Sequence, residues 1–307
     1  MRARVWAAIL LSSLGWGTGG VATRAALNQD VAPYLLVALR TMMAAVAVVV
    51  FLAVRKSDVW RSRRLWKLGV VQGVGNLAAP GVLVTLSLQY ASAGFVVIVF
   101  ALVPIVTALF AHFMLADEPM RLGMLAGLVV ATGGVAVLVV SGDSGLDEGG
   151  RPLLAFALAA AAVTLIGFSS VYAKIRAASY NAIGLGGLQF VSGAVVLLLL
   201  TLAIEGMPDT VGGEAWSLIT YLAIAATIMP FLVFFWTLQH ATATLASLSG
   251  YLVPIIGVTA GIVLLDEQLQ SGLIFGGFLI LVGVMISDQV DRRAPQALAV
   301  PDPEPFR

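Results

Sequence analysis

Arg40 stands inside a long run of apolar residues, nine positions after Val31. A helix that enters a membrane near Val31 would carry this side chain roughly 13–14 Å deep, close to the middle of a ~30 Å hydrocarbon core. A charge at that depth is a functional hypothesis by default, and a guanidinium fork matches a carboxylate or a phosphate. We expect Arg40 either to bind an anionic ligand group or to cap carbonyls and polar side chains of neighbouring helices.

Aromatic and polar side chains in other apolar runs could stack on a small molecule and hydrogen-bond to it. The candidates for such binding are Trp16, Thr18, Asn76, Gln189, Phe190, Trp236 and Tyr251. For each of them, contact with lipid or packing between helices is the alternative.

Proline inside a helix removes a backbone hydrogen bond and bends the helix. Four prolines lie within the apolar runs: Pro80, Pro104, Pro230 and Pro254. Such bends are natural points for gating, and a purely static role in helix shape stays open beside it.

The chain lacks the residues and motifs that several kinds of site require. The chain has no Cys, and we find neither an HExxH motif nor a P-loop, so we expect no metal site, no cofactor and no enzyme activity. No Asp or Glu lies in the core of any apolar run, which argues against a buried carboxylate that exchanges a proton for a cation. His112 and His240 could carry coupling protons, or they could serve packing.

The composition of the chain indicates whether it is surrounded by water or by lipid. Of 307 residues, 60% are hydrophobic and 11% are charged, and the mean hydropathy is +1.01. Soluble domains carry about 25% charged residues, so these values indicate a protein whose partner is the lipid bilayer. A net charge of +1 gives no support for a nucleic-acid partner.

The apolar runs predict an all-α membrane protein, because each is long enough for a helix to cross a bilayer and lacks the alternation of a barrel strand. The ten expected spans cover residues 4–25, 31–54, 66–88, 92–114, 121–141, 153–174, 182–204, 215–237, 242–264 and 272–289.

Basic residues orient these spans. With the N-terminus in the cytoplasm, fourteen Lys and Arg residues fall on the cytoplasmic side and two on the other. Both termini are therefore expected in the cytoplasm, and the Pro-rich segment 291–307 is expected to be a disordered cytoplasmic tail.

The chain contains an internal repeat. Residues 88–118 and 238–267 both open with Leu-Gln-x-Ala, carry Val-Pro in the middle and close on Asp-Glu. Matches of this kind extend over five spans, which gives halves 1–145 and 146–290. Five is odd, so the second half enters the membrane inverted, an arrangement typical of alternating access. The two Asp-Glu pairs could each begin the next helix, or form a gate salt bridge.

The chain resembles the EamA family of the drug/metabolite transporter superfamily in four features: WGTGG at residues 16–20, Arg24, Arg40 and the repeated VP…DE elements. The resemblance implies ten helices, a bacterial inner membrane and carriage of small metabolites, often amino acids or their relatives and commonly outward. Phe168 and Ser169-Ser170 depart from the WGT pattern in the second half.

We therefore expect a secondary transporter that exports amino acids or related carboxylate or zwitterionic compounds by alternating access. An exporter or importer of another metabolite or drug class is the alternative, and a channel or an intramembrane enzyme is a remote one. Whether the chain acts as a monomer or a homodimer is left open.

Overall fold

The structure, a computed structural model, describes residues 2–54, 58–115, 122–146, 149–177, 182–206, 210–240 and 249–292, and every regular element in these ranges is helical. In chain order the elements are α1 (Arg2–Leu27), α2 (Pro33–Val54), η1 (Asp58–Arg61), α3 (Arg63–Gln72), η2 (Gly73–Ala78), α4 (Ala79–Ser87), α5 (Ala93–Phe100), α6 (Val103–Met114), α7 (Leu122–Val140), α8 (Pro152–Ala177), α9 (Ala182–Ile204), α10 (Gly213–Ala223), η3 (Ile224–Ile228), α11 (Met229–His240), α13 (Ser249–Leu265) and α14 (Ser271–Arg292).

These helices confirm the predicted membrane architecture. Among the described residues, eight helical stretches are long and apolar enough to cross a membrane, and two shorter apolar helices, Ser249–Leu265 and Ser271–Ser287, follow. The described part of the ninth span begins at Ser249 because residues 241–248 lie outside the described residues. Residues 291 and 292 still belong to α14, and the remainder of the predicted tail lies outside the described part.

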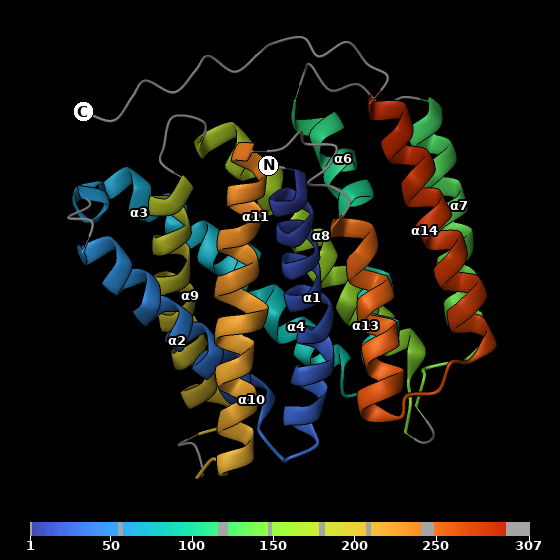
Figure 1. Cartoon of the computed structure of the whole chain (residues 1–307), viewed down its shortest axis with the longest axis horizontal. Coiled ribbons are helices and arrows are strands. Elements are labelled where there is room, and N and C mark those ends of the chain that lie inside the picture. Colours follow the sequence, from blue (N-terminus) through green and yellow to red (C-terminus); the bar gives the residue numbers. More distant parts are fainter. Residues whose placement is uncertain are drawn as a thin grey trace.

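The helices form two halves of opposite direction. In Figure 1, α1 begins beside the mark N, whereas α8, its counterpart, begins at the far end of the bundle. Neighbours also correspond: α1 packs on α10 and α11 as α8 packs on α3 and α4, and α2 contacts α9 as α5 contacts α13. The end where α1 begins is called the Arg2 end below, and the opposite end is called the Glu267 end.

Helices α7 and α14 pack as an antiparallel pair at one side of the bundle (Figure 1). A Cβ atom placed on Gly134 would lie 2.7 Å from the Gly276 carbonyl oxygen, and one on Gly276 would lie 2.8 Å from the Gly134 carbonyl oxygen. In lipid no hydrophobic effect drives helices together, so such close main-chain approach is what provides the packing energy.

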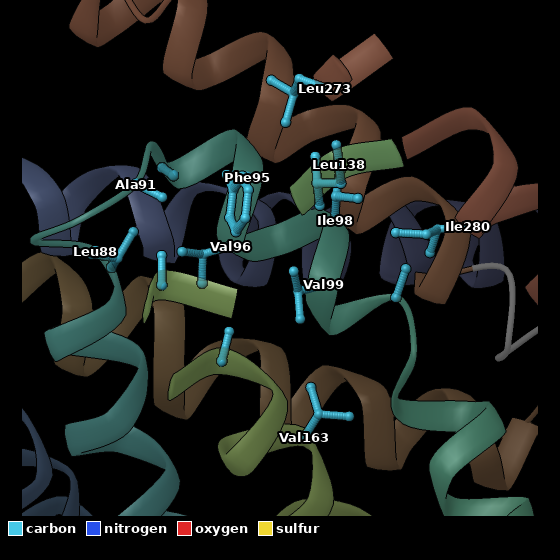
Figure 2. Packing of buried hydrophobic residues seen from close by; sticks show 14 of the residues in the cluster. Leu88, Ala91, Phe95, Val96, Ile98, Val99, Leu138, Val163, Leu273 and Ile280 are labelled. Atoms are coloured by element: carbon cyan, nitrogen blue, oxygen red, sulfur yellow. The ribbon is translucent and has the colours of Figure 1, made fainter. Parts of the chain in front are cut away.

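A buried cluster surrounds α5. Ser92 begins this helix, because its hydroxyl accepts a hydrogen bond from the Phe95 N–H at 3.0 Å. Figure 2 shows Phe95 and Val99 of α5 among side chains that include Val163 of α8 and Ile280 of α14. One face of α5 is thus fixed in the core, and this fixes the direction of the opposite face.

The third membrane span of each half, α3–η2–α4 and α10–η3–α11, contains a π-helical segment at the corresponding place. The π-helical segments η2 and η3 end two residues before Pro80 and Pro230, respectively. A π-helix accommodates one extra residue in a turn, which suits a position where proline cannot donate its backbone bond. The other two prolines differ, since Pro104 lies in the first turn of α6 and Pro254 lies within α13.

Candidate functional site

A cavity of about 550 Å³ lies between the two halves. Its described lining comes from α1, α2, η2, α4, α5 and α6 of the first half and from α8, η3 and α13 of the second. Sites for small molecules usually measure about 300–1,000 Å³. The space therefore fits one small molecule that is held by both halves.

The described lining is mostly apolar. Its residues with a polar side-chain group are Trp16, Thr23, Arg40, Asn76 and Ser249. The Thr23 hydroxyl donates to the Gly19 carbonyl at 2.7 Å and so is already used. No Asp or Glu occurs in this lining, so Arg40 gives the described cavity a positive charge.

Arg40 reaches the cavity from α2, about two turns after this helix begins at Pro33. Its guanidinium group lies beside Gly81 of α4, where a Cβ atom would approach Nη2 to 3.4 Å. Within the part of the chain that the structure describes, Arg40 has neither a hydrogen-bond nor an ion-pair partner, and none of its nitrogen atoms is fully enclosed. The group is available to a ligand.

Asn76 and Trp16 also line the cavity, as Arg40 does. Asn76 lies in η2, one turn before Pro80, and its side chain makes no hydrogen bond with a described residue. Trp16 contributes from α1. The structure therefore brings these three predicted contact residues together in one space.

The remaining predicted contact residues do not reach the described lining: Thr18, Gln189, Phe190, Trp236 and Tyr251. Thr18 bonds to the Leu14 carbonyl and to the Tyr221 hydroxyl, both at 2.6 Å. It does so because the face of α1 that carries Thr18 is turned toward α10, while Trp16 and Gly20 are turned toward the cavity.

Two of these residues pack between helices instead. Gln189 and Phe190 of α9 are buried, with exposed fractions of 9% and 3%. Phe190 meets the Phe231 ring edge to face, at 5.8 Å between centroids. Tyr251 packs against the cluster around α5, and Trp236 is partly exposed on α11. Gln189 and Phe190 are thus part of the packing between helices.

Three of the four prolines, Pro80, Pro104 and Pro254, line the cavity, whereas Pro230 lies against Gly15 of α1. His112 contacts the ring of Phe113 at 5.1 Å and does not line the cavity, and the side chain of His240 lies outside the described part. The apolar wall residues, among them Val97, Phe100 and Ile166, were not predicted, because an apolar side chain gives the same sequence signal whether it faces lipid or a cavity.

Glu267 joins the second half to α5, a helix that lines the cavity. The carboxylate accepts hydrogen bonds from the N–H groups of Ala93 and Gly94, at 2.6 and 3.1 Å, and so caps the N-terminus of α5. Ala93 itself lines the cavity. The prediction that Asp266-Glu267 begins its own next helix is wrong in this respect, since α14 begins at Ser271 and the capped helix belongs to the other half.

Arg24 complements this cap from the first half. Its Nη1 donates to the carbonyls of Leu88 and Ala91, which lie between α4 and α5. Its charge also interacts with that of Glu267. The C-terminal carbonyls of α4 thus meet a cation and the N-terminal amides of α5 meet an anion, which matches the helix dipoles.

The loops at the Glu267 end add further bonds between the halves. The Gly145 N–H donates to the Gln270 side-chain oxygen at 2.8 Å, and the Gly272 N–H donates to the Asp143 carboxylate at 2.7 Å. Polar contacts therefore join the two halves at this end. Toward the Arg2 end its lining reaches Ser249 and Gly250, where the described part of α13 begins.

Comparisons with known proteins agree with this arrangement. Two curated relatives are uncharacterized transporters of Bacillus subtilis (strain 168): YoaV, 24% identical over 92% of this chain and 96% of its own length, and YvbV, 24% identical over 93% and 91%. Protein PecM of Dickeya dadantii (strain 3937) is 25% identical over 74% of both chains.

One protein of known crystal structure has the same fold as this chain. The TM-score is 0.65 and the sequence identity is 22%, and the match covers 95% of this chain and 99% of that chain. The model of the EamA-like transporter family matches residues 4–140 and again residues 153–287, which together span nearly the whole chain. The protein, a helical membrane protein built from two related halves, belongs to the EamA-like transporter family.

Proposed function

We propose that the protein is a secondary transporter that exports small metabolites bearing a carboxylate, amino acids or related zwitterions among them, across the bacterial inner membrane. The two inverted halves would expose the cavity to each side in turn. One chain supplies both halves of the cavity, so we infer that one chain suffices for transport.

The observation that carries this proposal is Arg40, a cation in the cavity without a described partner. A charge in a low-dielectric site is costly until an opposite charge joins it. A carboxylate that binds the guanidinium with two parallel hydrogen bonds supplies that charge and fixes the orientation of the substrate. Asn76 and Trp16 offer a second polar contact and a stacking surface.

The direction of transport is proposed from the contacts between the two halves at the Glu267 end. Polar contacts join the halves at the Glu267 end, and the cavity lining extends toward the Arg2 end. The excess of basic residues favours a cytoplasmic position for the Arg2 end. A cavity reached from the cytoplasm is the state in which an exporter takes up its substrate.

Counterflow in proteoliposomes tests the proposal. A panel of amino acids, organic acids and purines is offered to the wild type and to Arg40→Ala, with Arg63→Ala at an exposed helix end as the matched control. We expect saturable exchange of carboxylates by the wild type and by Arg63→Ala. Arg40→Ala should bind them roughly tenfold to a hundredfold more weakly, since charged hydrogen bonds contribute about 1.5–3 kcal/mol.

Equal carboxylate affinity in Arg40→Ala and the wild type would show that Arg40 has no binding role. Exchange of purines alone would favour another metabolite class of the same superfamily, and uptake proportional to concentration would favour a channel. Arg40→Lys, which keeps the charge and loses the fork, separates an effect on binding from a failure to fold.

A further inference from the structure

Each of the four prolines, Pro80, Pro104, Pro230 and Pro254, lacks the N–H that would bond to the carbonyl four residues before it. The carbonyls that lose this α-helical donor belong to Asn76, Phe100, Ala226 and Gly250. All four residues line the cavity, and they form two repeat-related pairs, Asn76 with Ala226 and Phe100 with Gly250. Residues whose carbonyls lack an α-helical donor thus gather at the place where a substrate would bind.

Two of these positions present their main chain most directly. Gly250 has no side chain, so its main-chain atoms are those that line the cavity, and a Cβ atom there would meet nothing within 4 Å. Phe100 is the last residue of α5, where bonds run from Ala101 to Ile98 and from Leu102 to Val99. No described backbone bond across this break is accepted by the Phe100 carbonyl.

Asn76 lies about one helical turn from the residue that is beside the cation. The Arg40 guanidinium group lies beside Gly81, which directly follows Pro80, and Asn76 precedes Pro80 by one turn. One turn of helix rises about 5.4 Å. Asn76 and the residue beside the guanidinium group are therefore about one turn apart along the helix, a spacing that a small zwitterion can bridge.

An amine in this cavity needs such acceptors. No Asp or Glu lies in the described lining, and Arg40 would repel an ammonium group that had no counter-charge. Carbonyl oxygens in non-α-helical backbone hold cations in membrane channels and transporters, where they replace water. Four carbonyls without their helical donors could do the same for an ammonium group.

We propose that the transporter recognises the ammonium group of its substrate through the main-chain carbonyls that the four prolines release, while Arg40 holds the carboxylate. The inference rests on the proposed function, because it concerns the second charge of the same substrate. It makes the prolines determinants of specificity, and it explains how a zwitterion is bound without an acidic side chain in the described cavity.

The test compares amino acids with acids of the same carbon skeleton that lack the amine. Leucine with 4-methylpentanoate, phenylalanine with 3-phenylpropanoate and serine with 3-hydroxypropanoate are offered as inhibitors of counterflow in proteoliposomes. The readout is the ratio of the two inhibition constants of a pair. The variants are Pro80→Ala and Pro254→Ala, one in each half, and Pro152→Ala is the matched control because Pro152 begins α8 and releases no helical carbonyl.

For at least one pair, we expect the wild type and Pro152→Ala to prefer the amino acid by about tenfold, the effect of a charged hydrogen bond. In Pro80→Ala and Pro254→Ala the preference should fall several-fold, because a restored N–H competes for the carbonyl, and the amine-free acid should still inhibit counterflow in a saturable way. The inhibition constant of the amine-free acid also shows that each variant is folded.

A wild type that binds carboxylates through Arg40 and does not prefer the amine would overturn this inference and leave the proposed function intact. So would proline variants that keep the wild-type ratio, or that weaken both members of a pair equally. A wild type that binds no member of any pair would overturn both proposals.

Discussion

The carboxylate of Glu267 accepts a hydrogen bond from the N–H of Ala93 at 2.6 Å, and this contact joins the second half of the protein to the first. Ala93 begins α5 and lines the cavity, so the bond lies at the cavity's boundary. A cavity that opens toward the Glu267 end must separate α5 from the turn that follows α13. The Glu267 cap is therefore a candidate gate.

Replacing Glu267 with Gln should loosen this gate. The amide keeps one acceptor and loses the charge that favours a helix N-terminus, a loss of about 1–2 kcal/mol and so a roughly fivefold to thirtyfold larger open population. The chain has no native Cys. The rate at which an impermeant reagent labels a Val97→Cys probe in the cavity wall, from the Glu267 side, measures the opening.

Asp266→Asn is the matched control for this variant. Asp266 adjoins Glu267, adopts a left-handed conformation with φ of 52°, which Asn tolerates, and makes no described hydrogen bond. It should label at the wild-type rate. Equal labelling of Glu267→Gln and Asp266→Asn would show that the cap is not a gate.

Gly81→Ala should disturb the position of Arg40. The added Cβ atom would lie 2.9 Å from Val37 Cγ1 and 3.4 Å from Arg40 Nη2. Because α2 and α4 pack together here, one of these side chains must move. We expect a severalfold rise in the half-saturating concentration of a carboxylate substrate with little change in maximal rate, measured by counterflow. An unchanged half-saturating concentration would show that Gly81 does not position Arg40.

Gly134→Ala and Gly133→Ala form a matched pair that tests the contact between α7 and α14. A Cβ atom on Gly134 would collide with main-chain atoms of Gly276 and Ile280, whereas one on Gly133 would meet nothing within 4 Å. Overpacking costs about 1–3 kcal/mol, so the melting temperature in detergent should fall for Gly134→Ala alone. Equal melting temperatures would contradict the described packing.

Labelling from one side at a time tests the proposed orientation. Glu214→Cys and Arg63→Cys place exposed thiols at opposite ends of the bundle, at the starts of α10 and α3. In intact cells an impermeant reagent should modify the first and not the second. The reverse pattern would place the N-terminus outside the cell.

The ten spans could be predicted from composition and segment length, because a bilayer imposes a minimum apolar length on every helix. The predicted bounds for the second span, 31–54, differ from α2 only at its start, where Pro33 sets the first turn. Trp16, Arg40 and Asn76 could be selected as well, since polar groups inside apolar runs are rare enough to stand out.

Other features depend on contacts that sequence does not record. The register of η2 and η3 is chosen by packing around Pro80 and Pro230, and the proline signal alone indicates only that a bond is missing. Gln189 looks like a binding residue until the packing of α9 against its neighbouring helices buries it. The partner of Glu267 lies 174 positions away, beyond any local pattern.

Arg40, which has no counter-charge among the described residues, also has an electrical consequence if the two halves alternate as proposed. When the empty cavity opens first to one solution and then to the other, this cation is exposed to different parts of the membrane potential. Moving one elementary charge through the full potential changes the energy by about 2.3 kcal/mol per 100 mV. A cell interior that is negative would therefore hold the empty protein with Arg40 facing the cytoplasm, and voltage would set how often it returns to collect substrate.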